Sequence, residues 1–359
     1  MTGPARYDSL CLCLTAGIAA GTLFLGVFPF PWVFTFIVSL CLTIGCALSV
    51  RFRPDMGRLA LLFLLTGLLC ALSDGMSSHF AGHGGVAFAE RFADRVKDTI
   101  GSIPYACSTT GGLVKGLLTG DRSGIAKEVR DVFRASGASH ILALSGLHLG
   151  IIYSIILGLC TPLGNGRTAR WIKYAATVLL CGFYAAAAGF GASITRAFLF
   201  ILISETLKIL GRPRRSMRVL LTALVIQLVA NPSVISDTGF QLSYLAMTGI
   251  TVLYPVLNSW YPSSGHDRAD LPRLIWQAAA LSISCQVFTG PLAWLRFHSF
   301  PKYFLLTNIL AMPVTTAVMV TSVIVISLSA AGCCPGWMVA ANEKTVSILL
   351  GILTVISEM

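Results

Sequence analysis

The sequence predicts an all-α fold, a polytopic transmembrane helical bundle of about eleven membrane helices with external amphipathic helices. Of the 359 residues, 55% are hydrophobic and only 11% are charged, and the mean hydropathy is +0.79. A soluble globular chain carries roughly a quarter charged residues, so this chain has too few charges to cover a water-facing surface. Runs such as 10–28, 32–50 and 312–331 are nearly uncharged, and a spanning helix needs roughly 20 apolar residues.

Apolar segments predict the individual helices, at 8–28, 32–50, 58–74, 139–160, 171–189, 193–210, 217–230, 239–258, 273–292, 303–330 and 337–358. Lys and Arg in short loops mark the cytoplasmic side of a membrane. Every other loop is basic, and the basic loops hold Arg51, Arg53 and Arg58, then Arg167, Arg170 and Lys173, then Arg212, Arg214, Arg215 and Arg218, and finally Arg268 and Arg273. The alternation predicts a multi-pass protein whose N-terminus is cytoplasmic. It explains part of the formal net charge of +11.

The same alternation divides the chain into N-terminal transmembrane helices at 1–75, an external helical segment at 76–138 and a second transmembrane domain at 139–359. The external segment has apolar residues at helical spacing between 89 and 100 and again between 125 and 133, which predicts amphipathic helices. Lys127, Arg130 and Arg134 line one face of the second helix. Two interpretations stay open for them, a surface that gathers an anionic partner or a solvated face with local ion pairs such as Lys127 with Asp131.

Metal and disulfide chemistry find little support in the sequence. Most of the 11 cysteines lie in apolar runs, where cysteine behaves as a small apolar residue, and there is no Cys-x-x-Cys pair. The 6 histidines form no His-x-His-x-Asp-His pattern. We therefore expect no metal site, no cofactor and no catalytic residue.

A first polar cluster interrupts the apolar helices at 189–196. Gly189 and Gly191 let the backbone turn tightly, and Ser193 is a plausible N-cap. Arg196 would then lie in the first turn, where a cation opposes the helix dipole and is poorly placed for stability alone. Free N–H groups and an arginine together favour an anion site. The alternative is an arginine that snorkels to the outer interface.

A second cluster lies at 231–243. Asn231-Pro232 ends a short helix, Gly239 opens the next, and Gln241 follows in its first turn. Irregular backbone at membrane depth is tolerated where it is buried in protein or lines a cavity. Asp237 would neutralise Arg196 when no substrate is present, or it caps an ordinary outer turn.

A third cluster contains Ser145, Gly146 and His148. Ser145 and His148 are three residues apart and would share a helix face. Such a pair suggests a hydrolase, but no clear third group orients His148, and the surrounding sequence is not Gly-x-Ser-x-Gly. Ser145 and Gly146 more plausibly let helices approach closely. His148 either lines a pore or is a satisfied core histidine.

Several motifs follow one another along the chain: Leu117–Arg122, Phe133–Gly137, Ser139–His148, Gly191–Ala197, Asn231-Pro232 with Gly239–Ser243, and Gln286–Pro291 followed by Asn308 and Pro313. In this order they resemble the ComEC family of competence DNA channels, over roughly Leu113 to the C-terminus. The resemblance implies that 139–359 is a competence-type channel domain in the bacterial inner membrane, which takes up single-stranded DNA during transformation. It implies as partners single-stranded DNA, the lipid bilayer, a separate DNA receptor, a nuclease and a cytoplasmic ATPase, together with a homo-oligomer.

Two departures from the family pattern shape the expected function. Members typically carry a small OB-like β-barrel domain before the competence domain, and about sixty helical-looking residues stand in that place here. Many also carry a metallo-β-lactamase-like nuclease domain, and this sequence lacks its metal motif. The expected protein is a pore and not an enzyme.

In this interpretation Arg122, Lys127, Arg130 and Arg134 gather the strand at the outer mouth, and Ser193 and Arg196 lower the barrier deeper in. His148, Asp237 and Gln241 are further residues of the path. The alternatives are a permease for a smaller anion, which shares the argument from Arg196, and an intramembrane hydrolase that uses Ser145 and His148.

Overall fold

The computed structural model describes residues 4–27, 43, 56–77, 87–164, 166–261, 271–298 and 302–359. Every regular element in these ranges is a helix, which confirms the all-α prediction for the described part of the chain. The helix predicted at 32–50 lies outside the described residues except for Thr43. Contacts divide the chain into two compact units, one of Met1–Gly85 with Leu210–Tyr244 and one of Val86–Ile209 with Leu245–Met359.

The first unit is built on a close crossing of two helices, α1 (Pro4–Val27) and α3 (Met56–Ser77). Gly17 of α1 lies against the carbonyl of Leu64, and Gly67 of α3 lies against the carbonyl of Leu14, so an added Cβ at either glycine would overlap backbone. Small residues at a crossing let apolar helices approach closely. Helix α11 (Ser216–Ala230) and the short 3-10 turn η2 (Pro232–Ser236) pack on this pair.

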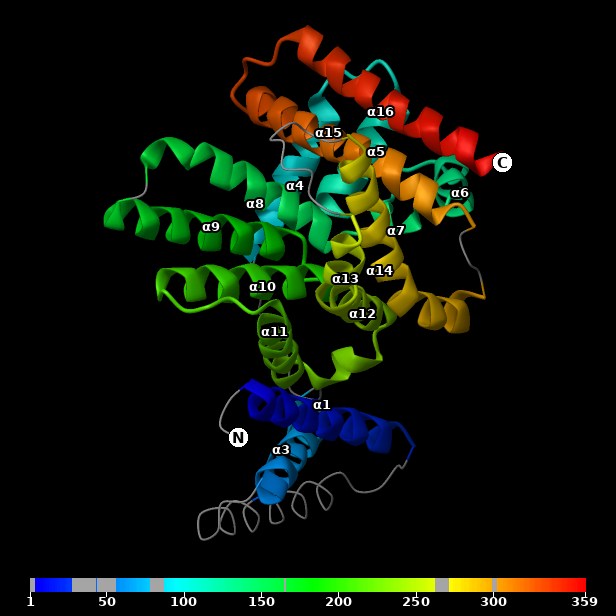
Figure 1. Cartoon of the computed structure of the whole chain (residues 1–359). Helices are drawn as coiled ribbons and strands as arrows, with labels where there is room; N and C mark the ends of the chain where they lie inside the picture. Colours follow the sequence, from blue (N-terminus) through cyan, green and yellow to red (C-terminus); the bar gives the residue numbers. More distant parts are fainter. Residues whose placement is uncertain are drawn as a thin grey trace. The chain divides into compact units, whose positions relative to one another are not determined.

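Three neighbouring helices of the second unit form a bundle that holds the candidate site. Helices α8 (Gly146–Leu159), α9 (Arg167–Ala187) and α10 (Ala192–Ile209) pack against one another, and each runs antiparallel to the helix before it in the chain (Figure 1). The 3-10 turn η1 (Thr161–Leu163) follows α8. Leu149, Cys181 and Ile194, one from each helix, are almost completely buried and form the centre of this bundle.

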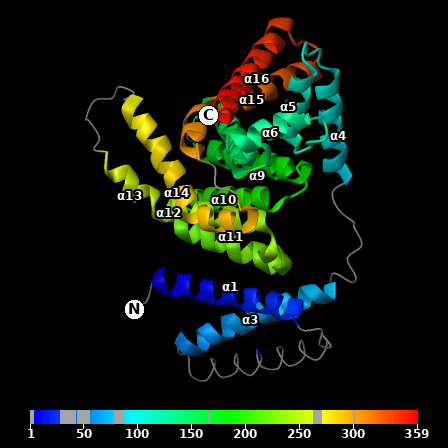
Figure 2. The ribbon, with the colours of Figure 1, turned by 90° about the vertical axis from the view of Figure 1, so that its right-hand side faces the viewer.

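A second layer of the same unit joins the segment before the bundle to the end of the chain. Helices α15 (Phe304–Ala330) and α16 (Gly336–Ser357) form a hairpin, and α4 (Ala87–Ser102), α5 (Ser108–Thr119), α6 (Lys127–Ala135) and α7 (Ser139–Leu142) pack beside it (Figures 1 and 2). The shared core includes Leu113, Leu117, Phe133, Met319 and Leu349. The Tyr105 hydroxyl donates to Asn342 Oδ1 at 3.1 Å toward one end of the hairpin, and the Thr307 hydroxyl donates to the Ser136 carbonyl at 2.6 Å toward the other.

Long apolar helices account for most of the remaining chain. Helix α12 (Thr238–Val252) leads into α13 (Tyr254–Ser259), and α14 (Leu271–Phe297) packs on α13. By length and composition, 4 described segments are able to cross a membrane: Thr238–Ser259, Leu271–Phe297, Phe304–Ala330 and Gly336–Ser357. These segments indicate a membrane protein, while the count of about eleven membrane helices stays a prediction.

The structure corrects the sequence analysis at two places before the bundle. The helix predicted at 139–160 is broken, because Ala143 (ψ 130°) and Ser145 (ψ 169°) are extended between α7 and α8. Helix α5 was not predicted, since Gly111, Gly112 and Gly116 give its sequence a low helix propensity. Burial of its apolar residues overrides that propensity, and the absent side chain at Gly112 admits the backbone of Gly124.

Candidate functional site

The turn between α9 and α10 determines where α10 begins and therefore where Arg196 lies in that helix. The Phe190 and Gly189 amides donate to the carbonyls of Ala185 and Ala186, the paired bonds of a Schellman motif, and Gly189 has φ 74°. After this turn the chain becomes helical again at Ala192, so Ser193 is the second residue of α10. The prediction of Ser193 as the N-cap is therefore wrong, and Arg196 lies in the second turn and not the first. Gly189 is needed for its left-handed backbone, whereas Gly191 has no positive φ.

The Arg196 guanidinium lies at the start of α8 rather than at the start of its own helix. A Cβ built on Gly146, the first residue of α8, would lie 2.8 Å from Arg196 Nη2 and 3.3 Å from Ala197 Cβ. Arg196 is only 7% exposed. A helix N-terminus carries a partial positive charge and free N–H groups, so a cation held against it raises the potential at that point. The arrangement favours an anion, which would interact with both groups.

His148 lies in the same turn of α8 and is completely buried. The Ser145 amide donates to His148 Nδ1 at 3.1 Å, and Ser145 Oγ lies 3.0 Å from the same nitrogen. Because a backbone N–H can only donate, Nδ1 is the acceptor and the ring proton of the neutral histidine is on Nε2. Nε2 has no hydrogen-bond partner among the described residues, so its N–H is a buried, unsatisfied donor.

Ser145 and His148 therefore form a capping box at the start of α8. The prediction that they share a face of one unbroken helix is wrong, because Ser145 lies before the first residue of α8. The close approach predicted at Gly146 is present, with Arg196 and Ala197 of α10 against it.

The basic residues of the preceding segment have different environments. Lys127, Arg130 and Arg134 are exposed on α6, and Lys127 forms no ion pair with Asp131. Glu128 and Asp131 lie on the same helix, so its net charge is small. Arg122 makes a hydrogen bond within the protein, since its Nε donates to the Leu142 carbonyl at the end of α7 at 3.1 Å.

Asp121, next to Arg122, is held by local contacts. Its carboxylate pairs with Lys115 Nζ at 2.8 Å and accepts bonds from the Ser123 amide at 3.0 Å and the Ser123 hydroxyl at 2.6 Å. The bond from Lys115, followed by those from Ser123, holds the pKa of Asp121 well below its ordinary value. This part of the Leu117–Arg122 motif thus folds a turn between α5 and α6.

The second cluster of the sequence analysis satisfies its own polar groups. Asp237 Oδ1 accepts the Phe240 amide at 2.9 Å, so Asp237 caps α12. Gln241 Nε2 donates to the Ile235 carbonyl at 2.7 Å, and Ser233 Oγ donates to Asn231 Oδ1 at 2.7 Å. Gly239 lies in the capped turn, where an added Cβ would come 3.0 Å from Asp237 Oδ1. Of the two interpretations left open for Asp237, the structure supports the cap.

One buried acidic residue was missed. Glu205 of α10 is 5% exposed, accepts the Tyr153 hydroxyl at 2.8 Å and pairs with Lys208 at 3.2 Å. The signal was available in the sequence, because a Glu inside an apolar helix needs a partner. Within the part of the chain that the structure describes, no group of His, Cys, Asp or Glu side chains is placed to hold a metal ion.

Comparison with known proteins finds relatives that share part of this sequence. The chain is 24% identical over 212 residues to the uncharacterized protein YcaI of Escherichia coli (strain K12), which covers 58% of this chain and 28% of that protein. It is 26% identical over 223 residues to ComE operon protein 3 of Bacillus subtilis (strain 168), covering 61% of this chain and 27% of that protein. The matched segment thus spans little more than a quarter of each relative. No solved structure matches significantly.

The family comparison covers more of the chain. The family model described as Competence protein matches residues 117–359, which begins in α5 and includes α6–α16. The match contains the Arg196 site, the Asp237 cap and the four long apolar segments. The chain belongs to the competence protein family.

Proposed function

We propose that this chain forms a channel through the bacterial inner membrane that passes single-stranded DNA during natural competence. The observation that carries the proposal is the buried guanidinium of Arg196 at the N-terminus of α8, inside a bundle of apolar helices. Charged residues among membrane helices are energetically costly and generally mark the path of a substrate or ion. Membership of the competence protein family supports DNA as that substrate.

The site matches the chemistry of a DNA backbone. Each phosphate carries a negative charge and needs compensation when it leaves water. Arg196 supplies a charge and a planar set of donors, the N-terminus of α8 supplies the positive end of the helix dipole, and His148 Nε2 supplies a further N–H. A channel site must bind weakly enough to release its substrate, and a single cation beside neutral donors suits that requirement better than a dense cluster.

The exposed residues Lys127, Arg130 and Arg134 would gather the strand before it reaches the bundle. They recur at i, i+3 and i+7 on α6 and therefore share one face. We place this helix outside the inner membrane and the N-terminus in the cytoplasm, following the charge alternation of the loops. We assign the chain no catalytic step, and we expect a DNA receptor, a nuclease and an ATPase to act with it.

Deleting the gene in its native host tests the proposal. We expect nuclease-protected, labelled DNA inside the cells to fall to background and to return when a plasmid supplies the wild-type chain. Uptake of radiolabelled phosphate, measured in the same strains, should not change. Unchanged DNA uptake would refute the channel, and a loss of phosphate uptake alone would favour the permease for a smaller anion.

A further inference from the structure

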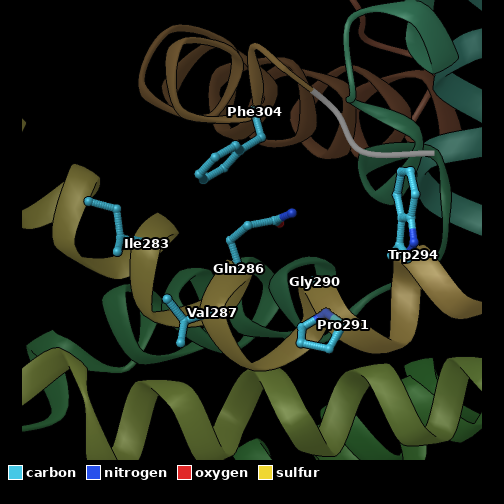
Figure 3. Close-up of a pocket in the computed structure, with 7 residues that line it drawn as sticks. All are labelled: Ile283, Gln286, Val287, Gly290, Pro291, Trp294 and Phe304. Carbon is cyan, nitrogen blue, oxygen red and sulfur yellow. The ribbon is translucent and has the colours of Figure 1, made fainter. Parts of the chain in front are cut away.

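A pocket on α14 combines aromatic walls with hydrogen-bonding groups. Its volume is about 610 Å3, and it lies between α14 and Phe304 at the start of α15. Figure 3 shows the Gln286 side chain extending from α14 into the space bordered by Phe304 and Trp294. All of its lining residues belong to the second unit.

Two polar groups border this pocket. The Gln286 carboxamide makes no hydrogen bond with the described residues, although the side chain is partly buried. Pro291 has no N–H, so the Val287 carbonyl cannot make its usual bond four residues along α14. Val287 and Pro291 both line the pocket. An apolar wall therefore carries a side-chain donor, a side-chain acceptor and a backbone acceptor.

This combination selects among ligand classes. A lipid acyl chain would fill the apolar space and leave the carboxamide and the carbonyl without partners. A transmembrane helix would do the same, because its backbone groups are already bonded to each other. A nucleobase has flat apolar faces that stack on aromatic side chains and an edge of donors and acceptors that pairs with an amide.

We propose that the α14 pocket is a nucleobase site, in which a base stacks on Phe304 or Trp294 and its edge bonds to Gln286 and the Val287 carbonyl. This inference rests on the proposed function and names a subsite of the same channel. The position of α14 supports it. Both sites belong to the second unit, and Arg196 acts electrostatically on Cys285, the neighbour of Gln286.

Binding to the purified full chain in lipid nanodiscs tests the base site directly. The probes are a fluorescent oligothymidine and an abasic strand with the same number of phosphates. We expect the double variant Trp294→Leu with Phe304→Leu to weaken oligothymidine binding about tenfold, the range expected for base stacking. Gln286→Leu should weaken it by a smaller factor, because it removes only edge hydrogen bonds, and both variants should leave the abasic strand unaffected. Arg196→Gln should weaken both strands. Trp337→Leu, at an aromatic that is 69% exposed on α16, is the matched control and should change neither.

Photo-crosslinking with an oligomer that contains 5-iododeoxyuridine gives a second readout. Iodouracil reacts with aromatic side chains on which it stacks, so mass spectrometry should find the crosslink on Trp294 or Phe304. Equal affinity of the wild type for the two strands, or crosslinks only outside the pocket, would overturn the base site and leave the channel proposal intact. Binding of neither strand would overturn both.

Discussion

Two polar clusters in apolar helices looked alike in the sequence, and the structure separates them. Around Asp237, the polar side chains singled out in the sequence find local partners, since Asp237 caps α12 and Gln241 bonds the Ile235 carbonyl. At the start of α8, a guanidinium lies against a helix N-terminus, and the His148 Nε2 proton has no acceptor among the described residues. The difference teaches that local hydrogen bonds account for the first cluster, whereas the second retains a buried donor for which the described residues offer no acceptor.

The largest expected effect comes from removing the charge at the α8 site. Arg196→Gln should lower DNA uptake about tenfold or more at normal membrane levels, because a charge-assisted bond contributes about 1.5–3 kcal/mol and each 1.4 kcal/mol is roughly a factor of ten. Arg196→Lys keeps the charge without the planar fork and should retain part of the uptake. Nuclease-protected DNA per cell, divided by the protein level from immunoblots, is the measurement.

A double variant can break this interpretation. If Arg196 only balances an acidic side chain, adding Asp237→Asn to Arg196→Gln removes both charges and should restore uptake. Restoration would assign the arginine a structural role. Continued loss of uptake, with normal insertion, would support the anion site.

The geometry of the same site gives a smaller effect. Gly146→Ala places a Cβ 2.8 Å from Arg196 Nη2, which must displace the guanidinium, and should reduce uptake several-fold. Gly150→Ala is the matched control on the same helix, because no atom lies within 4 Å of its added Cβ. In a helix interior that second change should also favour folding slightly. Equal uptake by the two variants would show that contact with Gly146 does not position Arg196.

Most of the helices were predictable, because long apolar segments leave few alternatives to a membrane helix. The segments at 193–210, 217–230 and 337–358 correspond closely to α10, α11 and α16. The break before α8 was not predictable from hydropathy, since Leu142, Ala143 and Leu144 continue the apolar run. It depends on Ser145 and His148 forming a capping box, which is a matter of local geometry.

The candidate site was predictable in its residues and not in its arrangement. Arg196 stood out as a cation in an apolar helix, but its contact with Gly146 joins helices far apart in sequence.

The charges of the loops also predict less than the full arrangement of the helices. If the alternation of basic loops continues to the end of the chain, the turn between α15 and α16 lies on the cytoplasmic side of the membrane and the segment 76–138 on the other side. Tyr105 of that segment nevertheless contacts Asn342, which lies near the turn. The two placements are compatible only if this hairpin does not cross the full bilayer.

The Asp237 region should respond in stability and not in transport. Asp237→Ala removes the cap of α12 and should lower the free energy of unfolding by about 1 kcal/mol, whereas Asp237→Ser keeps a capping oxygen and should lose much less. Thermal unfolding in detergent measures both variants. Uptake per inserted molecule should stay normal. Loss of uptake by the stable Asp237→Ser variant would show that the carboxylate charge itself is needed.

The smallest effect concerns Asp121, a third polar motif whose groups are paired locally. Because Lys115 and Ser123 hold its pKa below the ordinary value, the stabilisation is complete above about pH 4, the unperturbed value for Asp, and is lost as the pH falls further. The Asp121 side chain is 26% exposed, so the contribution should stay within about 1 kcal/mol. Unfolding midpoints between pH 6 and pH 3 should fall less steeply in Asp121→Asn than in the wild type, and Lys115→Met should also flatten the profile. Uptake at neutral pH should be normal in both. Parallel profiles in all three proteins would mean that the pair contributes nothing to folding.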